Sequence, residues 1–256
     1  MNAALLSIWT LASRELVRFY RQRSRVVGAL LPPVVFWGLI GAGLGGSFQA
    51  GSQGPIQYLF PGTVMLIVLF TGIFSTISLI EDRKEGFLQS VLIAPIPRAS
   101  IVLGKLLGGS TLAWMQGAVF LVLAPAIGAV FTVGTFFQML VLLWLAAFAL
   151  TGLGFYFAWH LDSVQGFHAI MNLVLMPLWL LSGALFPPAG AALWLQWTMR
   201  LNPLTYGVEA LRRGLFPSLP GGPSMMLCLA VTLGFGLLTS IASFHAAGRR
   251  TTPTLP

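Results

Sequence analysis

Four long stretches of the sequence contain no Asp, Glu, Lys or Arg: residues 26–80, 106–161, 163–199 and 214–248. A helix that crosses about 30 Å of hydrocarbon needs about 20 apolar residues, so the first two stretches are long enough for two helices each and the others for one each. The apolar residues are continuous rather than alternating, which favours helices over a β-barrel. The sequence therefore predicts an all-α integral membrane protein with six transmembrane helices.

Composition supports a membrane location for the whole chain. Of its 256 residues, 57% are hydrophobic and 8% are charged, whereas a soluble domain carries about 25% charged residues. So few charges exclude a water-soluble globule, and so many apolar residues exclude a disordered chain. The net charge of +8 does not indicate nucleic-acid binding, because the bases lie between apolar runs rather than on one polar face. The single cysteine, Cys228, excludes an internal disulfide and a multi-cysteine metal site.

Glycine and proline clusters divide the apolar stretches into individual helices, with breaks expected at 45–55, 125–135 and 187–188. G-x-x-x-G pairs at 41/45 and 104/108 permit close helix approach. We expect a single transmembrane domain, 1–256, without a separate soluble part. Its predicted transmembrane helices are 26–46, 58–80, 101–126, 136–158, 166–186 and 224–246, and its other parts are an interfacial helix at 1–25, a charged segment at 81–98, outer helices at 188–223 and a tail at 247–256.

The basic residues predict the orientation of the chain in the membrane. With the N-terminus inside, most bases fall on the inner side, as expected for cytoplasmic segments. Both termini of this multi-pass protein are therefore expected in the cytoplasm, at the cell membrane. Lys105, just inside the third predicted helix, is expected to extend its amine to the interface. The inner bases are Arg14, Arg18, Arg21, Arg23, Arg25, Arg83, Lys84, Arg98, Lys105, Arg249 and Arg250, and the outer ones are Arg200, Arg212 and Arg213.

Residues 3–25 have the pattern of an amphipathic helix. Four arginines recur at helical spacing on one face, where they suit anionic headgroups, and an apolar stripe runs along the opposite face. The segment is either an interfacial helix or only a positive-inside anchor, and the two interpretations are compatible. Its basic region and the apolar stretch after it are too long for a cleaved signal peptide. The arginines are Arg14, Arg18, Arg21 and Arg25, and the stripe consists of Leu5, Trp9, Ala12, Leu16 and Phe19.

The segment 80–98 is too long for a simple charged turn. It contains half of the acids in the chain beside two bases. An apolar helical face follows, and two prolines end that helix before the third predicted span. The sequence therefore predicts a short amphipathic helix that contacts something at the inner membrane surface. The charged residues are Glu81, Asp82, Arg83, Lys84 and Glu85, the apolar ones Phe87, Leu88, Val91 and Leu92, and the prolines Pro95 and Pro97.

The outer segment 188–223 predicts two short helices that rest on, or dip into, the outer leaflet. Two tryptophans lie one turn apart, as interfacial tryptophans often do. An Asn-Pro pair then offers a helix N-cap followed by proline at the first helical position. In the next helix an acid stands three and four residues before two arginines, and a seventh span would bury these charges in lipid. The residues concerned are Trp194, Trp197, Asn202, Pro203, Glu209, Arg212 and Arg213.

The sequence contains no motif for nucleotide or zinc binding, since G-x-x-x-x-G-K-[ST] and H-E-x-x-H are both missing. An intramembrane protease built on Ser110 or Ser182 with His245 is a remote alternative, because small residues in membrane helices more often serve packing. An ion-coupled pump places ionisable groups at mid-membrane, and none lies there in the predicted spans. Any transport is therefore expected to draw its energy from a separate protein.

Three stretches of the sequence resemble the permease subunits of type-2 ABC exporters, the group that includes drug-resistance, nodulation-factor and polysaccharide export permeases. The run EDRKEGFLQSVLIAPIPRASIVLGK at 81–105 matches the acidic-basic-EG-x-L…P-x-x-R…GK segment of that family. SGALFP at 182–187 matches its S-G-x-x-F-P, and LNPLTYGVEAL at 201–211 matches its N-P-L-T-Y segment. With the six-span layout, the likeness covers nearly the whole chain.

The resemblance implies that this chain works with other subunits. The permease would dimerise and bind two copies of a separately encoded ABC ATPase, which would hold ATP and Mg. This chain itself would be no enzyme, with no catalytic residue and no bound cofactor or metal. Whether the two permeases are identical copies is left open.

The resemblance also implies roles for particular residues. Residues 81–92 would be the coupling helix that docks into the ATPase, and the outer segment would close the exit. Substrate would pass along the dimer interface, which the second and fifth helices line. Asp162, in a short inner loop, either contacts the ATPase or only flanks the membrane. The ATPase-coupling residues are Glu81, Asp82, Arg83, Glu85, Gly86 and Leu88, the outer-gate residues are Phe186, Pro187, Asn202, Pro203 and Tyr206, and the candidate path residues are Asn172 and Met176.

The substrate stays open between an amphiphilic drug, a lipid-like molecule and a glycan. A pathway with so few polar groups suits an amphiphile, whereas the 12% aromatic content suits a glycan. The chain has no large extracellular insert, which disfavours the substrates of family members that carry one. Outside the family, a secondary transporter and a membrane scaffold without transport activity are the alternatives.

Overall fold

A computed structural model describes residues 3–44, 54–188, 190–217 and 222–249, and these residues form helices and no strand. The loop expected at 45–55 therefore lies mostly outside the described residues, as does most of the tail at 247–256. The α-helices are α1 (Ala3–Arg21), α2 (Arg23–Leu44), α3 (Pro55–Ser75), α4 (Ile77–Lys84), α5 (Phe87–Ile93), α6 (Arg98–Leu121), α7 (Val133–His160), α8 (Val164–Leu180), α9 (Leu193–Leu201), α10 (Pro203–Leu215) and α11 (Met225–Arg249), and Ala124–Ile127 form a 3-10 turn.

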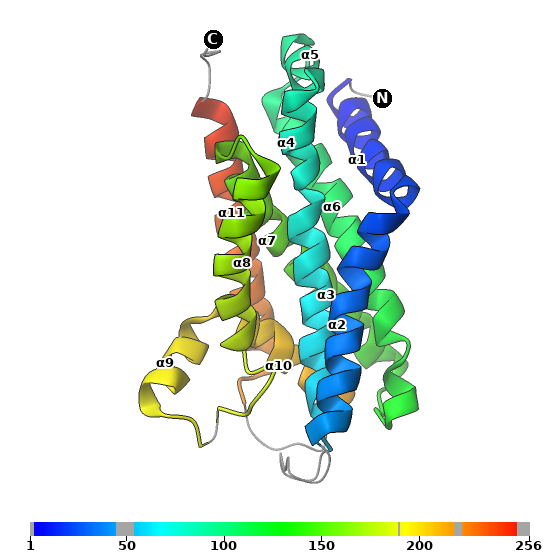
Figure 1. The fold of residues 1–256 in the computed structure, drawn as a ribbon, viewed down its shortest axis with the longest axis vertical. Coiled ribbons are helices and arrows are strands. Elements are labelled where there is room, and N and C mark those ends of the chain that lie inside the picture. The colour runs from blue at the N-terminus through cyan, green and yellow to red at the C-terminus, as the bar shows by residue number, and fades with distance from the viewer. Residues whose placement is uncertain (1–2, 45–53, 189, 218–221, 250–256) are drawn as a thin grey trace.

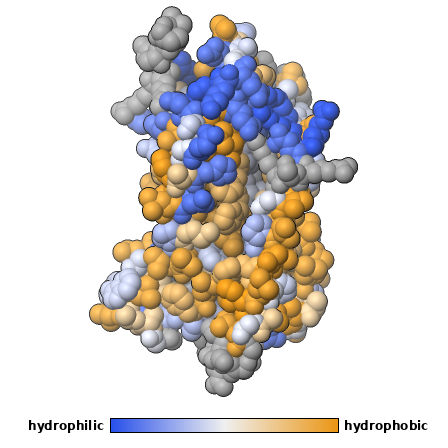
Figure 2. Space-filling view, in the orientation of Figure 1, coloured by the Kyte–Doolittle hydropathy of each residue, from blue (hydrophilic) through white to orange (hydrophobic). Residues whose placement is uncertain are grey.

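The helices form an elongated bundle whose two ends differ (Figure 1). The start of α1, the end of α11, and α5 lie at one end, and α9 and α10 lie at the other. Hydrophilic residues gather at the first end on the face seen in Figure 2, and hydrophobic residues cover most of the opposite end. We call these the inner and outer ends, following the orientation that the basic residues predict.

The centre of the bundle is the long helical unit made of α3 and α4, which only Thr76 separates. Of the most apolar window in Pro55–Lys84, 89% is buried inside the protein, against 17% for Val26–Leu44 in α2. A helix that is apolar all round belongs in the interior, whereas the exposed apolar side of α2 suits lipid. The helix α4 therefore extends directly from the buried core.

Four helical segments in the described parts of the chain are long and apolar enough to cross a membrane: Val26–Leu44, Pro55–Lys84, Val133–His160 and Met225–Gly248. The helices α6 and α8 lie where the sequence predicts the third and fifth spans, but they are not among these four, and α8 has only 17 residues. The count of six spans therefore stays a prediction.

Three helices end four or more residues from their predicted ends. One of them is α8, which ends at Leu180 although the predicted fifth span reaches residue 186, and the left-handed Gly183 follows it with a φ of 75°. The predicted second span stops at residue 80, but the helix continues to Lys84, because the first strong helix breaker is Gly86 with a φ of 76°. The charged residues therefore extend the central helix instead of opening a separate surface helix. The predicted third span reaches residue 126, but α6 ends at Leu121 and a 3-10 turn follows around Pro125.

The helix α1 lies against α6, and two glycines of α6 set their close approach. A Cβ atom at Gly104 would lie 2.7 Å from the Cβ of Leu11, and one at Gly108 would lie 2.8 Å from the Cβ of Glu15. These two glycines form one of the G-x-x-x-G pairs in the sequence, and small residues at that spacing let helix backbones approach. The contact brings the carboxylate of Glu15 to the side of α6.

Candidate functional site

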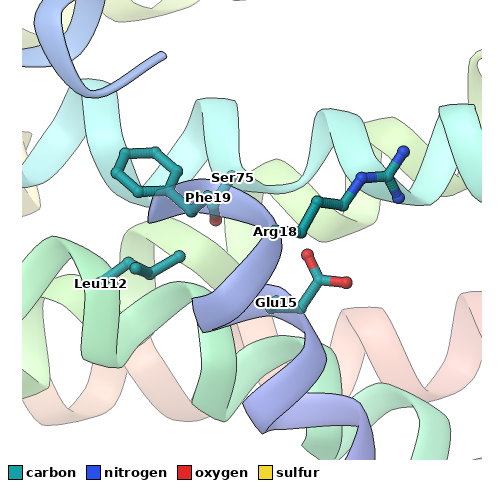
Figure 3. A pocket seen from close by; sticks show the side chains of 5 residues that line it. All are labelled: Glu15, Arg18, Phe19, Ser75 and Leu112. Atoms are coloured by element: carbon teal, nitrogen blue, oxygen red, sulfur yellow. The ribbon is translucent and has the colours of Figure 1, made fainter. Parts of the chain in front are cut away.

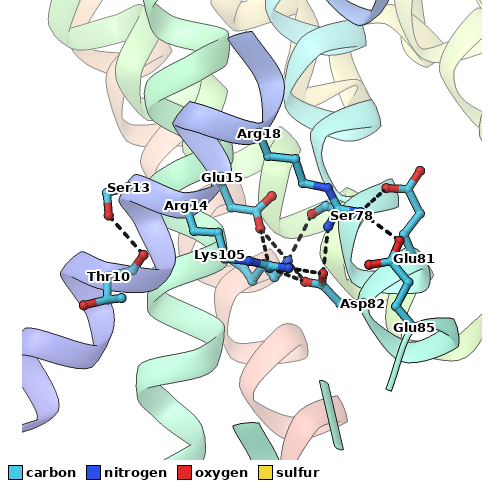
Figure 4. Close-up of polar contacts among 10 residues, drawn as sticks. All are labelled: Thr10, Ser13, Arg14, Glu15, Arg18, Ser78, Glu81, Asp82, Glu85 and Lys105. Atoms are coloured by element: carbon cyan, nitrogen blue, oxygen red, sulfur yellow. Dashed lines mark hydrogen bonds and ion pairs between the residues drawn. The ribbon is translucent and has the colours of Figure 1, made fainter. Parts of the chain in front are cut away.

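A cluster of charged side chains at the inner end joins three helices that are far apart in the sequence. Arginines and an acid of α1 meet two acids of α4 and the lysine of α6 (Figure 4). We call this cluster the charge junction, and it consists of Arg14, Glu15, Arg18, Glu81, Asp82 and Lys105.

Asp82 is the centre of the charge junction and is fully buried. Arg14 donates to both of its carboxylate oxygens, at 3.0 and 2.9 Å, and Arg18 donates to Oδ1 at 2.7 Å. Lys105 Nζ donates to Oδ2 as well. A buried carboxylate is costly unless it is paired and hydrogen-bonded, and here three cations from two other helices satisfy it. Asp82 thus has no free surface with which to touch another protein.

Lys105 is buried, and all of its contacts in the junction are inside the protein. Its amine donates to Glu15 Oε1 at 2.6 Å, to Ser78 Oγ at 3.1 Å and to Asp82. The prediction that Lys105 extends to the interface is therefore wrong. Two acids reach the amine inside the bundle, and charge pairing replaces the contact with water.

Arg14 and Arg18 of α1 face the acids of α4 and not the lipid headgroups, which corrects the prediction for these two, whereas Arg21 is exposed. Arg18 binds Glu81 at 2.9 Å as well as Asp82, and it lies 3.5 Å from Glu85. The guanidinium of Arg14 stacks 3.7 Å from the ring centre of Phe87. Its hydrogen bonds to Asp82 raise the pKa of Arg14 above the usual value.

The rest of the predicted α1 pattern divides between two environments. Ala12 and Phe19 are buried, but Leu5 and Trp9 are exposed. Only part of the predicted apolar stripe is therefore buried inside the protein. The side chain of Arg25 lies outside the described part of the chain. Periodicity correctly groups residues on one face of a helix, but the acids that draw that face inward belong to α4, which is distant in the sequence.

A small hollow lies beside the charge junction, between α1 and its neighbours (Figure 3). Its lining residues are Glu15, Arg18, Phe19, Ser75 and Leu112. It has no room for a bound molecule, so we regard it as a packing gap. Within the described residues, no group of three His, Cys, Asp or Glu side chains is placed to hold a metal ion.

The exposed end of α4 and α5 projects beyond the charge junction. Glu85 is 61% exposed, Gly86 makes the left-handed turn, and Leu88 is buried and anchors α5 to the core. Of the residues that the family resemblance singles out in this segment, Glu85 thus has the largest exposed side chain. We call the outward residues Lys84, Glu85, Gln89 and Ile93 the exposed tip.

Arg83 points away from the charge junction, to the opposite side of α4. It contacts the end of α7 and Asp162 in the loop that follows. Asp162 thus pairs with a residue of the charged segment 81–98. The adjacent residues Asp82 and Arg83 bind two different parts of the bundle.

The predicted outer-gate residues lie at the other end, where several of them fix the turn into α10. Asn202 caps α10 by accepting from the Leu204 amide at 2.9 Å, and it donates to the Leu178 carbonyl at 2.6 Å, so the predicted N-cap is confirmed. Pro203 occupies the first helical position, and Tyr206 donates to the Arg200 carbonyl at 2.9 Å. Phe186 and Pro187 are half-buried in the connection after α8.

Sequence reasoning found the Glu209–Arg212 pair, at 2.6 Å, but missed the other partners of Arg212. Its guanidinium donates to the Gly183 carbonyl at 2.9 Å and lies 4.3 Å from the ring centre of Tyr58. These contacts connect α10 with the start of α3 and with the turn after α8. Spacing within one helix gives no sign of them.

The candidate path residues Asn172 and Met176 lie one turn apart on the exposed side of α8. The structure thus brings the predicted site residues into three separate groups: the inner segment, the outer turn and the middle of α8. The inner segment and the outer turn lie at opposite ends of the bundle (Figure 1).

The junction residues that sequence reasoning missed left a detectable signal. Glu15 is the only acid before residue 81, and Lys105 is the only charged residue between Arg98 and Asp162. An ionisable side chain inside an apolar span needs a partner within the protein. This rule indicates that Lys105 is paired, although it does not say with which acid.

Comparison with known proteins identifies the family of this chain. The profile of the ABC-2 type transporter family matches residues 7–216, and the chain belongs to that family. Membership makes it a membrane transport permease, which is not itself an enzyme, and it implies an ATPase partner subunit.

Several relatives have low sequence identity to this chain, but the similarity extends over most of its length. Nodulation protein J of Rhizobium leguminosarum bv. trifolii is 29% identical over 234 residues, which cover 84% of each chain. The transport permease ycf38 of Cyanophora paradoxa is 26% identical over 219 residues, which cover 80% of this chain and 72% of that one. Nodulation protein J of Rhizobium meliloti (strain 1021) is 26% identical over 233 residues.

Proposed function

We propose that this chain is the membrane-spanning permease of an ATP-driven ABC exporter, which moves an amphiphilic drug, a lipid-like molecule or a glycan out of the cytoplasm. The observation that carries the proposal is the exposed tip, which is attached by the charge junction to α1 and α6 and by the helix itself to the buried α3. A surface element joined so firmly to the core suits the transfer of a closing motion from an ATPase to the membrane helices.

In this proposal, the residues of the coupling segment have different tasks. Glu85 and the rest of the exposed tip contact the ATPase, and Gly86 makes the turn that presents them. Glu81 and Asp82 hold the segment to α1, and Leu88 holds α5 to the core. ATP and Mg bind to the ATPase and not to this chain.

The remaining parts of the proposal follow the family. Six helices cross the membrane with both termini in the cytoplasm, α6 and α8 supplying the two spans beyond the four long apolar ones. Two permeases, either identical or similar, pair with two ATPase subunits. Substrate passes along their interface past Asn172 and Met176 and leaves by an outer gate that consists of Phe186, Pro187, Asn202, Pro203 and Tyr206.

The test is co-purification with the ATPase encoded nearest to this gene, followed by ATPase assays in lipid vesicles with a panel of amphiphiles and glycans. We expect stable binding and substrate-stimulated hydrolysis. In the double variant Glu85→Ala/Gly86→Ala, we expect ATP hydrolysis to continue with less transport for each ATP hydrolysed. The matched control is Gln138→Ala, an exposed residue at the start of α7, which should behave as wild type.

Normal coupling in the double variant would contradict the role of the tip. A secondary transporter would move substrate without any ATPase and would respond to an ion gradient instead. A scaffold would bind partners but move nothing in either assay.

A further inference from the structure

The side chain of Arg83 closes the end of α7. Its Nη2 donates to the Trp159 carbonyl at 2.8 Å, and its Nη1 donates to the Leu161 carbonyl at 3.1 Å and to Asp162 Oδ1 at 2.9 Å. The guanidinium also lies 5.8 Å from the ring centre of Trp159. One side chain of α4 thus contacts three residues, Trp159, Leu161 and Asp162, within about one turn of the place where α7 ends.

These carbonyls are the natural partners of a cation. The last four carbonyls of a helix have no donor within the helix, and the dipole makes that end negative. The planar fork of arginine can donate to two acceptors at once, which a lysine cannot do in the same geometry. The contact with Asp162 contributes less, because Asp162 is 81% exposed and exposed ion pairs are weak.

The connection after α7 is too short to absorb movement. α7 ends at His160 and α8 begins at Val164, and Ser163 caps α8 by accepting from the Gly166 amide at 3.0 Å. A displacement of the α7 end therefore reaches the first turn of α8. Further along, α8 carries Asn172 and Met176, the candidate path residues.

We propose that Arg83 is the positioning residue that transmits movement of the coupling segment to α8. Asp82, its neighbour, connects the same segment to α1 and α6, so the two residues send one motion to the two sides of the bundle. This inference rests on the proposed function, because it needs an ATPase that moves the segment.

The first test compares Arg83→Ala, Arg83→Lys and Asp162→Asn in vesicles that contain the permease and its ATPase. We expect Arg83→Ala to bind the ATPase and hydrolyse ATP normally, while transport per ATP falls at least tenfold. Arg83→Lys keeps the charge but not the fork and should be intermediate. Asp162→Asn keeps both carbonyl contacts and should change transport less than twofold.

The second test follows α8 directly. Spin labels at Gln165→Cys on α8 and at Val119→Cys on α6, both exposed positions, are introduced in a Cys228→Ser background, and their separation is measured by pulsed EPR. We expect ATP with vanadate to change this distance when Arg83 is present and to leave it unchanged in Arg83→Ala. A merely structural role for Arg83 would lower thermal stability without abolishing this change.

The outcomes separate the inference from the function on which it rests. An equal shift of α8 in Arg83→Ala, or loss of ATPase binding in that variant alone, overturns the role of Arg83 and leaves the exporter proposal intact. If the permease with Arg83 in place binds no ATPase and moves no substrate with ATP, the proposed function fails and the inference fails with it.

Discussion

The Tyr58 hydroxyl and the Arg212 guanidinium donate to the same acceptor, the carbonyl oxygen of Gly183, at 3.1 and 2.9 Å. Gly183 has a φ of 75°, a left-handed conformation that suits glycine. The start of α3, the helix α10 and the turn after α8 are therefore held at one point near the outer end. If the outer end opens, these two hydrogen bonds must either break or move together with the three segments that they join.

Removal of Arg212 should strongly destabilise the protein. Arg212→Ala leaves Glu209 without its partner at a half-buried position, and breaking a buried ion pair by removing one member costs about 3–5 kcal/mol. Tyr58→Phe removes one of the two hydrogen bonds to the Gly183 carbonyl and should lower the free energy of unfolding by about 1 kcal/mol. Thermal unfolding in detergent measures both effects.

The control for Arg212 is Arg200→Gln, an exposed residue whose guanidinium lies 5.2 Å from the ring centre of Trp197. It should change stability by less than about 1 kcal/mol. If Arg200→Gln and Arg212→Ala lowered the free energy of unfolding equally, the contacts at Gly183 would not contribute specially to stability.

Lys105 and Glu15 should be energetically coupled. Lys105→Met removes the cation that faces Glu15 and Asp82, and we expect a loss of about 3–5 kcal/mol. The double variant Lys105→Met/Glu15→Gln should be less unstable than the sum of the single variants, by about 0.5–3 kcal/mol. A double-mutant cycle from chemical unfolding measures this difference, and strict additivity would argue against the pair.

The contact between α1 and α6 depends on a missing side chain. At Gly108 a Cβ would lie 2.8 Å from the Cβ of Glu15, so Gly108→Ala should cost about 1–3 kcal/mol and loosen the charge junction. At Gly28 in α2 a Cβ would meet nothing within 4 Å, so Gly28→Ala should be neutral or stabilise the protein by up to about 1 kcal/mol. Unfolding curves of the two variants test this. Equal stability changes in Gly108→Ala and Gly28→Ala would contradict a steric role for Gly108 in the approach of α1 to α6.

The exposed tip should bind the ATPase partly through Ile93. Its side chain is 83% exposed beyond the charge junction, so Ile93→Asp should not alter the stability of the permease by more than about 0.5 kcal/mol. We expect it to reduce the amount of ATPase that co-purifies. Val130→Asp, at an equally open position near α10, is the control and should leave co-purification unchanged.

Local patterns predicted those parts of the structure that depend on local causes. Charge-free stretches located the long apolar helices, because burial in lipid forbids unpaired charge. The Asn202 cap was predictable because its acceptor and the Leu204 amide lie two residues apart. The end of the central helix near Gly86 was not predictable, because a helix that ends at residue 80 and one that ends at Lys84 have the same apolar pattern up to residue 80.

The site could be predicted only in part, because its contacts join distant segments. Helical spacing placed Arg14 and Arg18 on one face, but the direction of that face depends on Asp82, which lies 68 and 64 residues away. Likewise, the partners of Arg83 belong to α7 and its following loop. A single sequence shows that such charges require partners, but the three-dimensional fold selects them.

The buried position of Lys105 has a consequence for synthesis. A lysine inside an apolar helix is costly to place in a membrane, by about 2.5–3.5 kcal/mol when it lies at the centre and has no partner. Glu15 and Asp82 both precede Lys105 in the chain, so the ribosome has already delivered both acids when the lysine emerges. The acids that pair with Lys105 are therefore already synthesised when α6 is made, and in a chain that lacked α1 the lysine would lose Glu15 but keep Asp82 and Ser78.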